Sequence, residues 1–213
     1  MKKLYFIIIY TVLFALLSKW IYDHPEYPIP GINKGGKEMV IKNYGKIIAA
    51  LAPKFHLPQD YLLALIMLES SGKKRVPVRF EKEVYQKLLL TKKGKNQGFE
   101  KVNKEKLRKF SKRDLKKLAS SYGPFQIMGY KIFELNTSIS ELSGKNNIYW
   151  ALKWIDINYG NLLRKGDYKD AFHLHNAGEK YPENGKSKTY DPEYVQKGLE
   201  YVKYFRKRIK NDG

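Results

Sequence analysis

The hydrophobic pattern of the chain centres on residues 61–68, which are all aliphatic, methionine or tyrosine and leave no polar face at helical or strand spacing. Pro58 suits a first helical turn, Asp60 favours the positive end of a helix dipole, and Gly72 is a stop signal. At roughly 13 residues the segment is too short to cross a bilayer, which takes about 20. We therefore predict a buried helix in the core of a globular domain.

Helical spacing of apolar residues recurs along the rest of the chain, whereas strand signals are few. A stretch around Pro77 is expected to be extended, and residues 121–129 are expected to form a turn flanked by apolar and aromatic groups. The pattern predicts a mainly α-helical single domain around the buried helix, with little β-structure. Further helices are predicted at residues 40–51, 80–90, 112–118, 147–159, 171–178 and 194–209.

The N-terminal segment has a different pattern from the rest. Two lysines follow Met1, and residues 4–17 are apolar apart from Thr11, which is typical of an export signal or an anchor. No small-x-small cleavage pattern follows. With Trp20 and Tyr22 at the headgroups, residues 4–22 nearly span a membrane, so we expect an uncleaved anchor in the inner membrane rather than a cleaved signal peptide.

The predicted domain organisation follows from this segment. Residues 1–22 form the signal or anchor, the proline- and glycine-rich residues 23–37 form a tether, and residues 38–210 form the folded domain. The N-terminal lysines are expected to stay cytoplasmic while the remainder crosses the membrane. The domain is therefore expected at the extracytoplasmic face of the cell envelope.

Composition narrows the possible chemistry. The chain has no cysteine, which excludes disulfides, cysteine-ligated zinc and a thiol nucleophile. Its four histidines lack HExxH spacing, and the pair His173 and His175 would need further ligands to hold a metal. We expect neither a metal nor a cofactor.

The charge is strongly positive and uneven. The formal net charge is +20, and residues 91–118 hold twelve lysines or arginines against three acidic residues. Such a surface attracts nucleic acid, anionic lipid headgroups or the anionic polymers of a bacterial cell wall, unless it is only a solvated lysine-rich surface. No zinc finger, RNP aromatic motif or KH-type loop is present, so nucleic acid is not the expected partner.

Two polar residues stand out against apolar surroundings. Glu69 follows the buried helix directly, where its ionised form would be poorly solvated, so its pKa should rise unless it lies beyond the buried part and is hydrated. A carboxylic acid that stays protonated near neutral pH is what a glycosidase needs to protonate a leaving group. Gln126 is the only amide within 121–129 and is expected to have a specific partner.

Four segments resemble, in chain order, the motifs of the lysozyme-like lytic transglycosylase and muramidase families, which cleave peptidoglycan. The resemblance covers roughly residues 40–207 and implies a lysozyme-like fold of the goose-type or SLT kind. The segments, with the family motif each resembles, are Glu69-Ser70-Ser71-Gly72 (the catalytic Glu-Ser), Gly123 to Met128 (Gly-Leu-Met-Gln), His175-Asn176-Ala177-Gly178 (Ala-Tyr-Asn-Ala-Gly) and Tyr194-Val195 (the Tyr-Val that opens the last helix).

Two segments point to the phage-type N-acetylmuramidase branch. Residues 121–130 are similar to its Ser-Trp-Gly-Leu-Phe-Gln-Ile-Met-Gly segment, and residues 79–85 to its Leu-Phe-Glu-Arg-His-Val-Phe segment. Three departures are visible. Pro124 replaces the usual Leu, Glu83 stands where a His is usual, and His175 replaces the Tyr of the third motif.

The resemblance implies cleavage of the β-1,4 bond from N-acetylmuramic acid to N-acetylglucosamine, with Glu69 as the proton donor. If no second carboxylate activates water, the 6-hydroxyl of the sugar attacks and gives a 1,6-anhydro product, as in a lytic transglycosylase. If Glu81 lies across the cleft at about 6.5 to 9.5 Å, it can activate water for hydrolysis by a muramidase. Alternatively, Glu81 only stabilises a helix N-terminus.

The same motifs supply a set of candidate glycan-binding residues. Gln126 and Asn176 would hold acetamido or carbonyl groups, or else tie loops together. Tyr194 would bond near Glu69 or simply pack, and Tyr122 would stack on a sugar or pack in the core. The full candidate set is Ser70, Tyr122, Gly123, Gln126, His175, Asn176, Ala177 and Tyr194.

The expected partners are peptidoglycan strands and, through the N-terminal segment, the membrane. Two other function classes compete with the enzyme. A membrane-anchored, non-catalytic glycan-binding scaffold would keep the groove, although the intact Glu69 argues against it. A basic nucleic-acid-binding domain would explain the charge but neither the export segment nor the four motifs.

Overall fold

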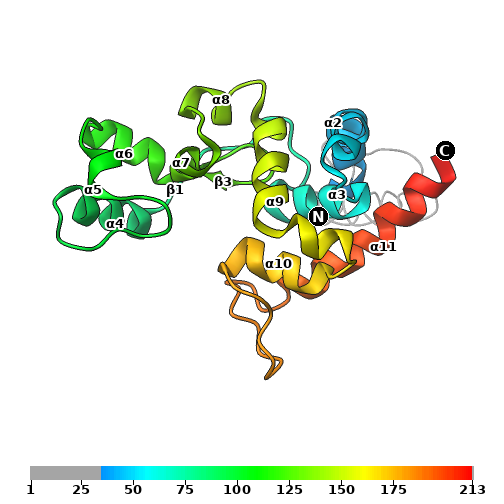
Figure 1. Ribbon diagram of the computed structural model, residues 1–213. Helices are drawn as coiled ribbons and strands as arrows, with labels where there is room; N and C mark the ends of the chain where they lie inside the picture. Colours follow the sequence, from blue (N-terminus) through cyan, green and yellow to red (C-terminus); the bar gives the residue numbers. More distant parts are fainter. Residues whose placement is uncertain (1–34, 213) are drawn as a thin grey trace, which may run out of the picture. The chain divides into compact units, whose positions relative to one another are not determined.

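The predicted buried helix is α3 (Gln59–Ser70), which packs against α2 (Gly36–Leu51) and α11 (Tyr194–Asp212) in the computed structural model (Figure 1). Every residue from 61 to 66 is buried, and the two apolar residues that follow are half-buried. The apolar stretch is thus surrounded by protein on all sides, which explains why it needs no polar face.

The structure describes residues 35–212, and within them the chain forms one mainly α-helical domain with ten α-helices, two 3-10 helices and a three-stranded antiparallel sheet. The remaining elements are η1 (Ala52–Phe55), β1 (Arg79–Phe80), α4 (Lys82–Lys92), α5 (Lys104–Leu107), α6 (Lys112–Leu118), β2 (Ser120–Tyr122), β3 (Ile127–Met128), η2 (Gly129–Lys131), α7 (Ile132–Leu135), α8 (Ile139–Ser143), α9 (Asn147–Arg164) and α10 (Tyr168–Ala177).

The N-terminal predictions fall mostly outside this range. The predicted anchor at residues 4–22 and the tether up to residue 34 lie outside the described residues. Gly36 and Lys37, assigned to the tether by the sequence, are the first residues of α2. Within residues 35–212, no helix combines the length and the apolar character that crossing a membrane requires.

The C-terminal end of α3 is fixed by its contact with α2. Ser71 adopts a left-handed conformation that ends the helix, and Gly72 follows with a φ of 71°. A Cβ on Gly72 would lie 2.5 Å from the backbone nitrogen of Val40, and the side-chain amide of Asn43 donates a 2.8 Å hydrogen bond to the Gly72 carbonyl. Because only glycine fits this close approach, α2 determines where the residues at the end of α3 lie.

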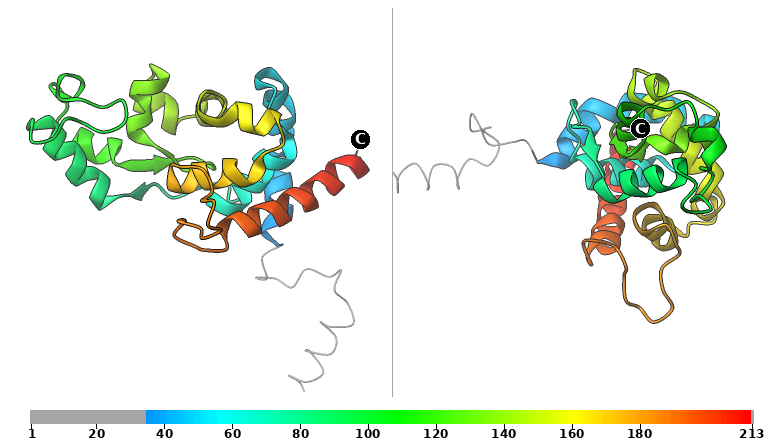
Figure 2. Two further views of the ribbon diagram at one scale, coloured as in Figure 1. Left: turned by 60° about the horizontal axis from the view of Figure 1, so that its bottom comes forward. Right: turned by 90° about the vertical axis from the view of Figure 1, so that its left-hand side faces the viewer.

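The other end of α3 is tied to the last helix. Asp60 forms a 2.7 Å ion pair with Arg206 of α11 and also accepts a hydrogen bond from the backbone N–H of Tyr61. The Tyr61 ring lies 4.4 Å from the Phe172 ring of α10, centroid to centroid. Figure 2 shows α11 running along this part of the domain. Two helices that are distant from α3 in the sequence, α10 and α11, thus pack against it together with α2.

The small sheet holds the expected turn. β1 pairs with β2 with Arg79 opposite Ser121, and β2 pairs with β3 with Tyr122 opposite Ile127, both antiparallel. The predicted turn at residues 121–129 is therefore a β-hairpin. Strands of two or three residues are too short to show a period in the sequence, which is why they were not predicted.

The helix predicted at residues 80–90 begins later than expected. Phe80 belongs to β1, and the backbone N–H of Glu81 donates a 2.8 Å hydrogen bond to the Ala119 carbonyl at the start of the hairpin. Glu81 is consequently the residue just before α4, not part of its first turn, and its side chain makes no capping hydrogen bond. Glu81 thus still lies at the N-terminus of α4, as the alternative interpretation of this residue expected, although the helix itself begins two residues later than predicted.

The helices predicted after the hairpin are present. The aromatic helix is longer than expected, since α9 continues to Arg164 through a kink at Tyr159, where φ is −149°. α10 ends at Gly178, and α11 begins at Tyr194 as predicted. Together with α3 and the hairpin, the end of α10 and the start of α11 surround one large cavity.

Candidate active site

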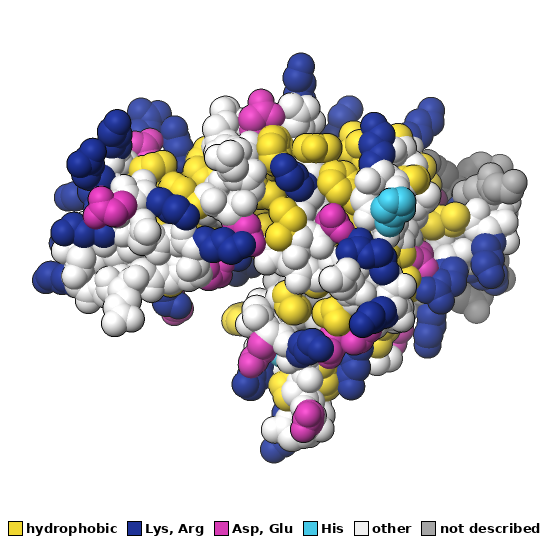
Figure 3. Space-filling model, viewed as in Figure 1, with side chains coloured by type: hydrophobic (Ala, Val, Ile, Leu, Met, Phe, Trp, Pro, Cys, Tyr) yellow, Lys and Arg dark blue, Asp and Glu magenta, His cyan; other side chains and the backbone are white. Residues whose placement is uncertain are grey.

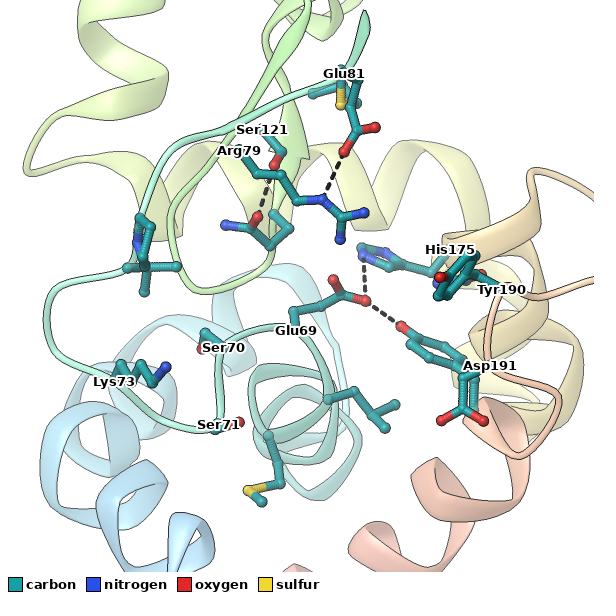
Figure 4. Close-up of a pocket in the computed structure, with 18 of the residues that line it drawn as sticks. Glu69, Ser70, Ser71, Lys73, Arg79, Glu81, Ser121, His175, Tyr190 and Asp191 are labelled. Atoms are coloured by element: carbon teal, nitrogen blue, oxygen red, sulfur yellow. Dashed lines mark hydrogen bonds and ion pairs between the residues drawn. The ribbon is translucent and has the colours of Figure 1, made fainter. Parts of the chain in front are cut away.

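A cavity of about 1130 Å³ opens at the C-terminal end of α3 (Figure 4). Its walls come from the last turn of α3, the connection to β1 and α4, the β2–β3 hairpin, the end of α10 and the start of α11. Three of the four sequence motifs that suggested a site thus converge on one space, together with the first residue of the fourth.

Glu69 extends from the last turn of α3 into this cavity (Figure 4). Its side chain is only 15% exposed, and burial raises its pKa from 4.5 to about 7. The hydrogen bond from Tyr194 and the positive charge of Arg79 act in the opposite direction but do not outweigh burial. The elevated pKa expected from the sequence is therefore a property of the folded chain, and a large fraction of Glu69 is protonated near neutral pH.

Tyr194 fixes which carboxyl oxygen of Glu69 carries the proton. The buried Tyr194 hydroxyl donates to Glu69 Oε1, while Oε2 has no hydrogen-bond partner among the described residues. Burial and the neighbouring Glu69 raise the pKa of Tyr194, so this hydroxyl remains a donor. A protonated Glu69 therefore carries its proton on Oε2, the oxygen left free for a ligand.

His175 lies beside Glu69 but is held by other groups. Its Nε2 is 3.2 Å from the Phe125 carbonyl, which can only accept, so Nε2 bears the hydrogen and Nδ1 accepts the Tyr159 hydroxyl at 2.6 Å. Burial lowers the pKa of His175 to about 4, so the ring is neutral at pH 7 and its 3.8 Å separation from Glu69 Oε1 is not an ion pair. Both ring nitrogens are therefore hydrogen-bonded within the protein, and the bond to Phe125 links α10 to the hairpin turn.

Gln126 has the specific partners that its apolar surroundings predicted. Its side-chain oxygen accepts the Ser121 hydroxyl at 2.7 Å, and its side-chain nitrogen donates to the Gly123 carbonyl at 3.0 Å. The amide thus ties the hairpin turn together, which is one of the two interpretations of the motif. The side chain still lines the cavity, and one amide hydrogen remains available to a ligand.

Three further candidates have structural partners. Ser70 lines the cavity, but its hydroxyl donates to the Ile66 carbonyl at 2.9 Å within α3. Tyr122 is buried and donates to the Lys117 carbonyl at 2.9 Å, and neither Tyr122 nor Gly123 lines the cavity. The packing interpretation of Tyr122 therefore fits the structure better than sugar stacking does.

Asn176 and Ala177 lie where a second cavity joins the first. This second space, of about 440 Å³, shares Gln126, His175 and Asn176 with the large cavity and has Ala177 on its own wall. The Asn176 side chain is exposed and makes no hydrogen bond within the described residues. It is thus the candidate whose polar groups are most available to a ligand.

Glu81 lines the large cavity but is already paired. Its Oε1 lies 2.9 Å from Arg79 Nε, and Figure 4 shows the Arg79 guanidinium between Glu81 and Glu69. The ion pair occupies this carboxylate oxygen, which is therefore not available to hold a water molecule. The pairing therefore limits Glu81 as an activator of water.

Sequence reasoning missed several residues that line this cavity. Tyr190 is 98% exposed and stands on the loop before α11, and Lys73 extends from the loop after α3. Asp191 and Lys197 form a 2.8 Å ion pair at the same wall. An aromatic residue within the polar, proline- and glycine-containing stretch 180–193 was a signal that could have identified Tyr190.

The histidine pair considered as a metal site has other roles. Nδ1 of His173 lies 2.8 Å from the Glu179 carbonyl, and Nε2 accepts the Lys188 N–H at 3.0 Å. His173 thus anchors the loop between α10 and α11. Within residues 35–212, no group of three or more His, Asp or Glu side chains is arranged to hold a metal ion.

The basic segment 91–118 forms the end of α4, a loop, α5 and α6, and Figure 3 shows lysine and arginine side chains covering this part of the surface. Eleven of its twelve basic residues are exposed. The twelfth, Lys92, donates to the carbonyls of Leu107, Arg108 and Phe110 and so helps to build the segment.

Comparisons of the chain with known protein families, with curated proteins and with solved structures found no match.

Proposed function

We propose that the protein is a peptidoglycan-cleaving glycosidase with a lysozyme-like fold, and specifically a lytic transglycosylase that uses Glu69 as its acid and base. One observation carries the proposal: a carboxyl group with a pKa of about 7 projects from the end of a buried helix into a large cavity, with one oxygen held by Tyr194 and the other free. This is the state that a general acid for glycoside cleavage requires. The four motifs in chain order give the substrate.

The mechanism follows from the free oxygen. Oε2 of Glu69 donates its proton to the bridging oxygen, the bond from that oxygen to C1 of N-acetylmuramic acid breaks, and positive charge develops on the sugar ring. The 6-hydroxyl of the same sugar then attacks C1 and returns its proton to Glu69. No water is consumed, and the enzyme ends as it began, with a 1,6-anhydro end on one fragment.

Hydrolysis by a muramidase is the second candidate, because Glu81 lines the same cavity. The ion pair with Arg79 argues against it, because a general base must contact the attacking water and Arg79 already occupies Oε1 of Glu81. Glu69 alone is sufficient for the transglycosylase route. We therefore favour anhydro products over reducing ends.

The contiguous cavities support binding of an extended glycan. Asn176 is available where they meet, and the exposed Tyr190 offers an aromatic face at the rim of the larger one. We place the enzyme at the extracytoplasmic face of the cell envelope, anchored through residues 4–22. A non-catalytic scaffold would need this groove but would gain nothing from a protonated Glu69.

The decisive test digests purified peptidoglycan with the full-length protein in detergent and identifies the new glycan ends by mass spectrometry, with Glu69→Gln in parallel. Anhydro ends that disappear in the variant support the transglycosylase, and reducing ends that disappear support the muramidase. Absence of release by either protein would exclude the catalytic proposal and favour the glycan-binding scaffold.

A further inference from the structure

Arg79 presents an unused hydrogen-bonding edge to the cavity beside Glu69. Arg79 belongs to β1 and its side chain is 72% exposed. In the part of the chain that the structure describes, its only ion pair is the one from Nε to Glu81. Among the described residues, its two terminal amino groups make no hydrogen bond. Figure 4 shows the group pointing into the space above Glu69.

The geometry of a guanidinium explains why Arg79 can pair with Glu81 and still bind a second carboxylate. Arginine has five N–H donors arranged along two edges, and the edge that contains Nε is the one that Glu81 uses. The end edge, formed by the two terminal amino groups, matches the two oxygens of a carboxylate. Glu81 thus contacts only Nε of Arg79 and leaves the N–H groups of the two terminal amino groups, which face the cavity, free of that ion pair.

The neighbouring charges favour an anion at this position. Lys73 lines the same cavity and has no ion pair within the described residues. Of the acidic side chains on the cavity wall, Glu69 is buried in a way that favours its neutral form, Asp191 is paired with Lys197 at 2.8 Å, and Glu81 is paired with Arg79. Glu83 has no ion pair with any residue of 35–212, but it is exposed to solvent in the first turn of α4, where water screens its repulsion.

A peptidoglycan strand carries carboxylates where this edge can reach them. The muramic acid that reacts at Glu69 bears the peptide stem on its lactyl group, and the lactyl carboxyl itself is consumed in the amide bond to the stem. The remaining carboxylates of an intact strand therefore belong to the stem residues. An arginine beside the acid faces the part of the substrate that distinguishes peptidoglycan from an uncharged glycan such as chitin.

We infer that the terminal edge of Arg79 binds a carboxylate of the peptide stem on the reacting sugar, so that Arg79 is a specificity-determining residue for stem-bearing strands. The inference rests on the proposed function for the identity of the substrate. It requires that removal of Arg79 matters only when the stem carries its charge.

The test compares soluble glycan strands with intact stems and the same strands after carbodiimide coupling has converted the stem carboxylates to methylamides. We expect Arg79→Gln to lower kcat/KM on the native strands roughly tenfold and on the amidated strands less than twofold. Arg79→Lys keeps the positive charge but lacks the two parallel N–H donors, so its kcat/KM on native strands should lie between those of the wild type and Arg79→Gln. Lys207→Gln on α11, which removes the same charge away from the cavity and outside segment 91–118, should change neither rate.

Binding measurements test the role of Arg79 without relying on cleavage of the strands. In a Glu69→Gln background, affinity for the native strands should fall when Arg79→Gln is added, while affinity for the amidated strands should not. Equal effects of Arg79→Gln on both kinds of strand would overturn the inference. Loss of cleavage with this binding difference intact would overturn the proposed function alone.

Discussion

Burial of Glu69 has opposite effects on its chemistry and on the stability of the fold. The folded chain shields the carboxyl from water, so its pKa rises from 4.5 to about 7, which stabilises the protonated form and penalises the ionised one. The same burial that makes Glu69 a proton donor near neutral pH must therefore destabilise the fold at higher pH. The size of that effect can be measured directly.

Between pH 4.5 and 7 the folded chain keeps the Glu69 proton while the unfolded chain loses it, so wild-type stability should fall as pH rises through this window. Glu69→Gln has no such proton, and its stability advantage over wild type should grow by about 3 kcal/mol from pH 4 to pH 8. His175, whose pKa is lowered to about 4, contributes the opposite slope to both proteins and cancels in the comparison. Urea unfolding at a series of pH values provides the measurement, and a pH-independent difference would contradict the raised pKa.

At this scale the sequence predicted Glu69 from its position after an apolar helix and Tyr194 from a motif. It could not predict where the Arg79 side chain points, which depends on the two-residue pairing of β1 with β2 and on the ion pair with Glu81. The role of His175 was also hidden, because its partners Tyr159 and Phe125 come from a helix kink and a turn.

Among the elements, the junction of α2 and α3 matters most for the site. Gly72 combines a left-handed backbone with a contact to Val40 that leaves no space for a side chain. Any displacement there moves the last turn of α3, which carries Glu69.

We expect Gly72→Ala to destabilise the domain by roughly 2 to 4 kcal/mol, because the methyl group must push the backbone of α2 away and the left-handed conformation is strained for alanine. Gly185→Ala is the matched control, since Gly185 has nearly the same φ, 74°, but open space around it. Thermal unfolding of both variants separates the two effects. Equal losses would show that the contact with Val40 contributes nothing.

The helices were predictable because their apolar residues repeat at three and four positions, as in α2 with its buried Val40, Tyr44 and Ile48. The strands were not, because two or three residues cannot display a period. The start of α4 was misplaced since the pairing of β1 with the distant β2 overrides the local helical preference of Phe80 and Glu81.

Over the whole molecule, the charge is concentrated away from the acid. The exposed basic residues of segment 91–118 lie on α4, α5, α6 and the loop between α4 and α5, whereas the cavity wall carries charges of both signs. The positive charge of the segment is suited to attract an anionic polymer, and on the proposed function the cavity would then bind the glycan itself.

We expect the combined replacement of Lys93, Lys95, Lys109 and Lys112 by glutamine to weaken retention on peptidoglycan several-fold at about 0.05 M salt and hardly at all at about 0.5 M, where exposed charges are screened. The control replaces the exposed Lys42, Lys46, Lys203 and Lys207 of α2 and α11, which lowers the net charge equally. Sedimentation with insoluble peptidoglycan measures the retained fraction. Equal weakening by both sets would show that total charge, not segment 91–118, is responsible.

The hydrogen bond between Tyr194 and Glu69 joins residues 125 positions apart, one on the last helix and one on α3. A ribosome makes the chain from its N-terminus, so the helix that bears Glu69 is complete long before the helix that bears Tyr194 exists. Until α11 arrives and covers α3, the carboxyl lacks both its hydroxyl partner and one wall of its pocket. On the proposed function, the acid is therefore complete only after α11 has been synthesised and has packed against α3.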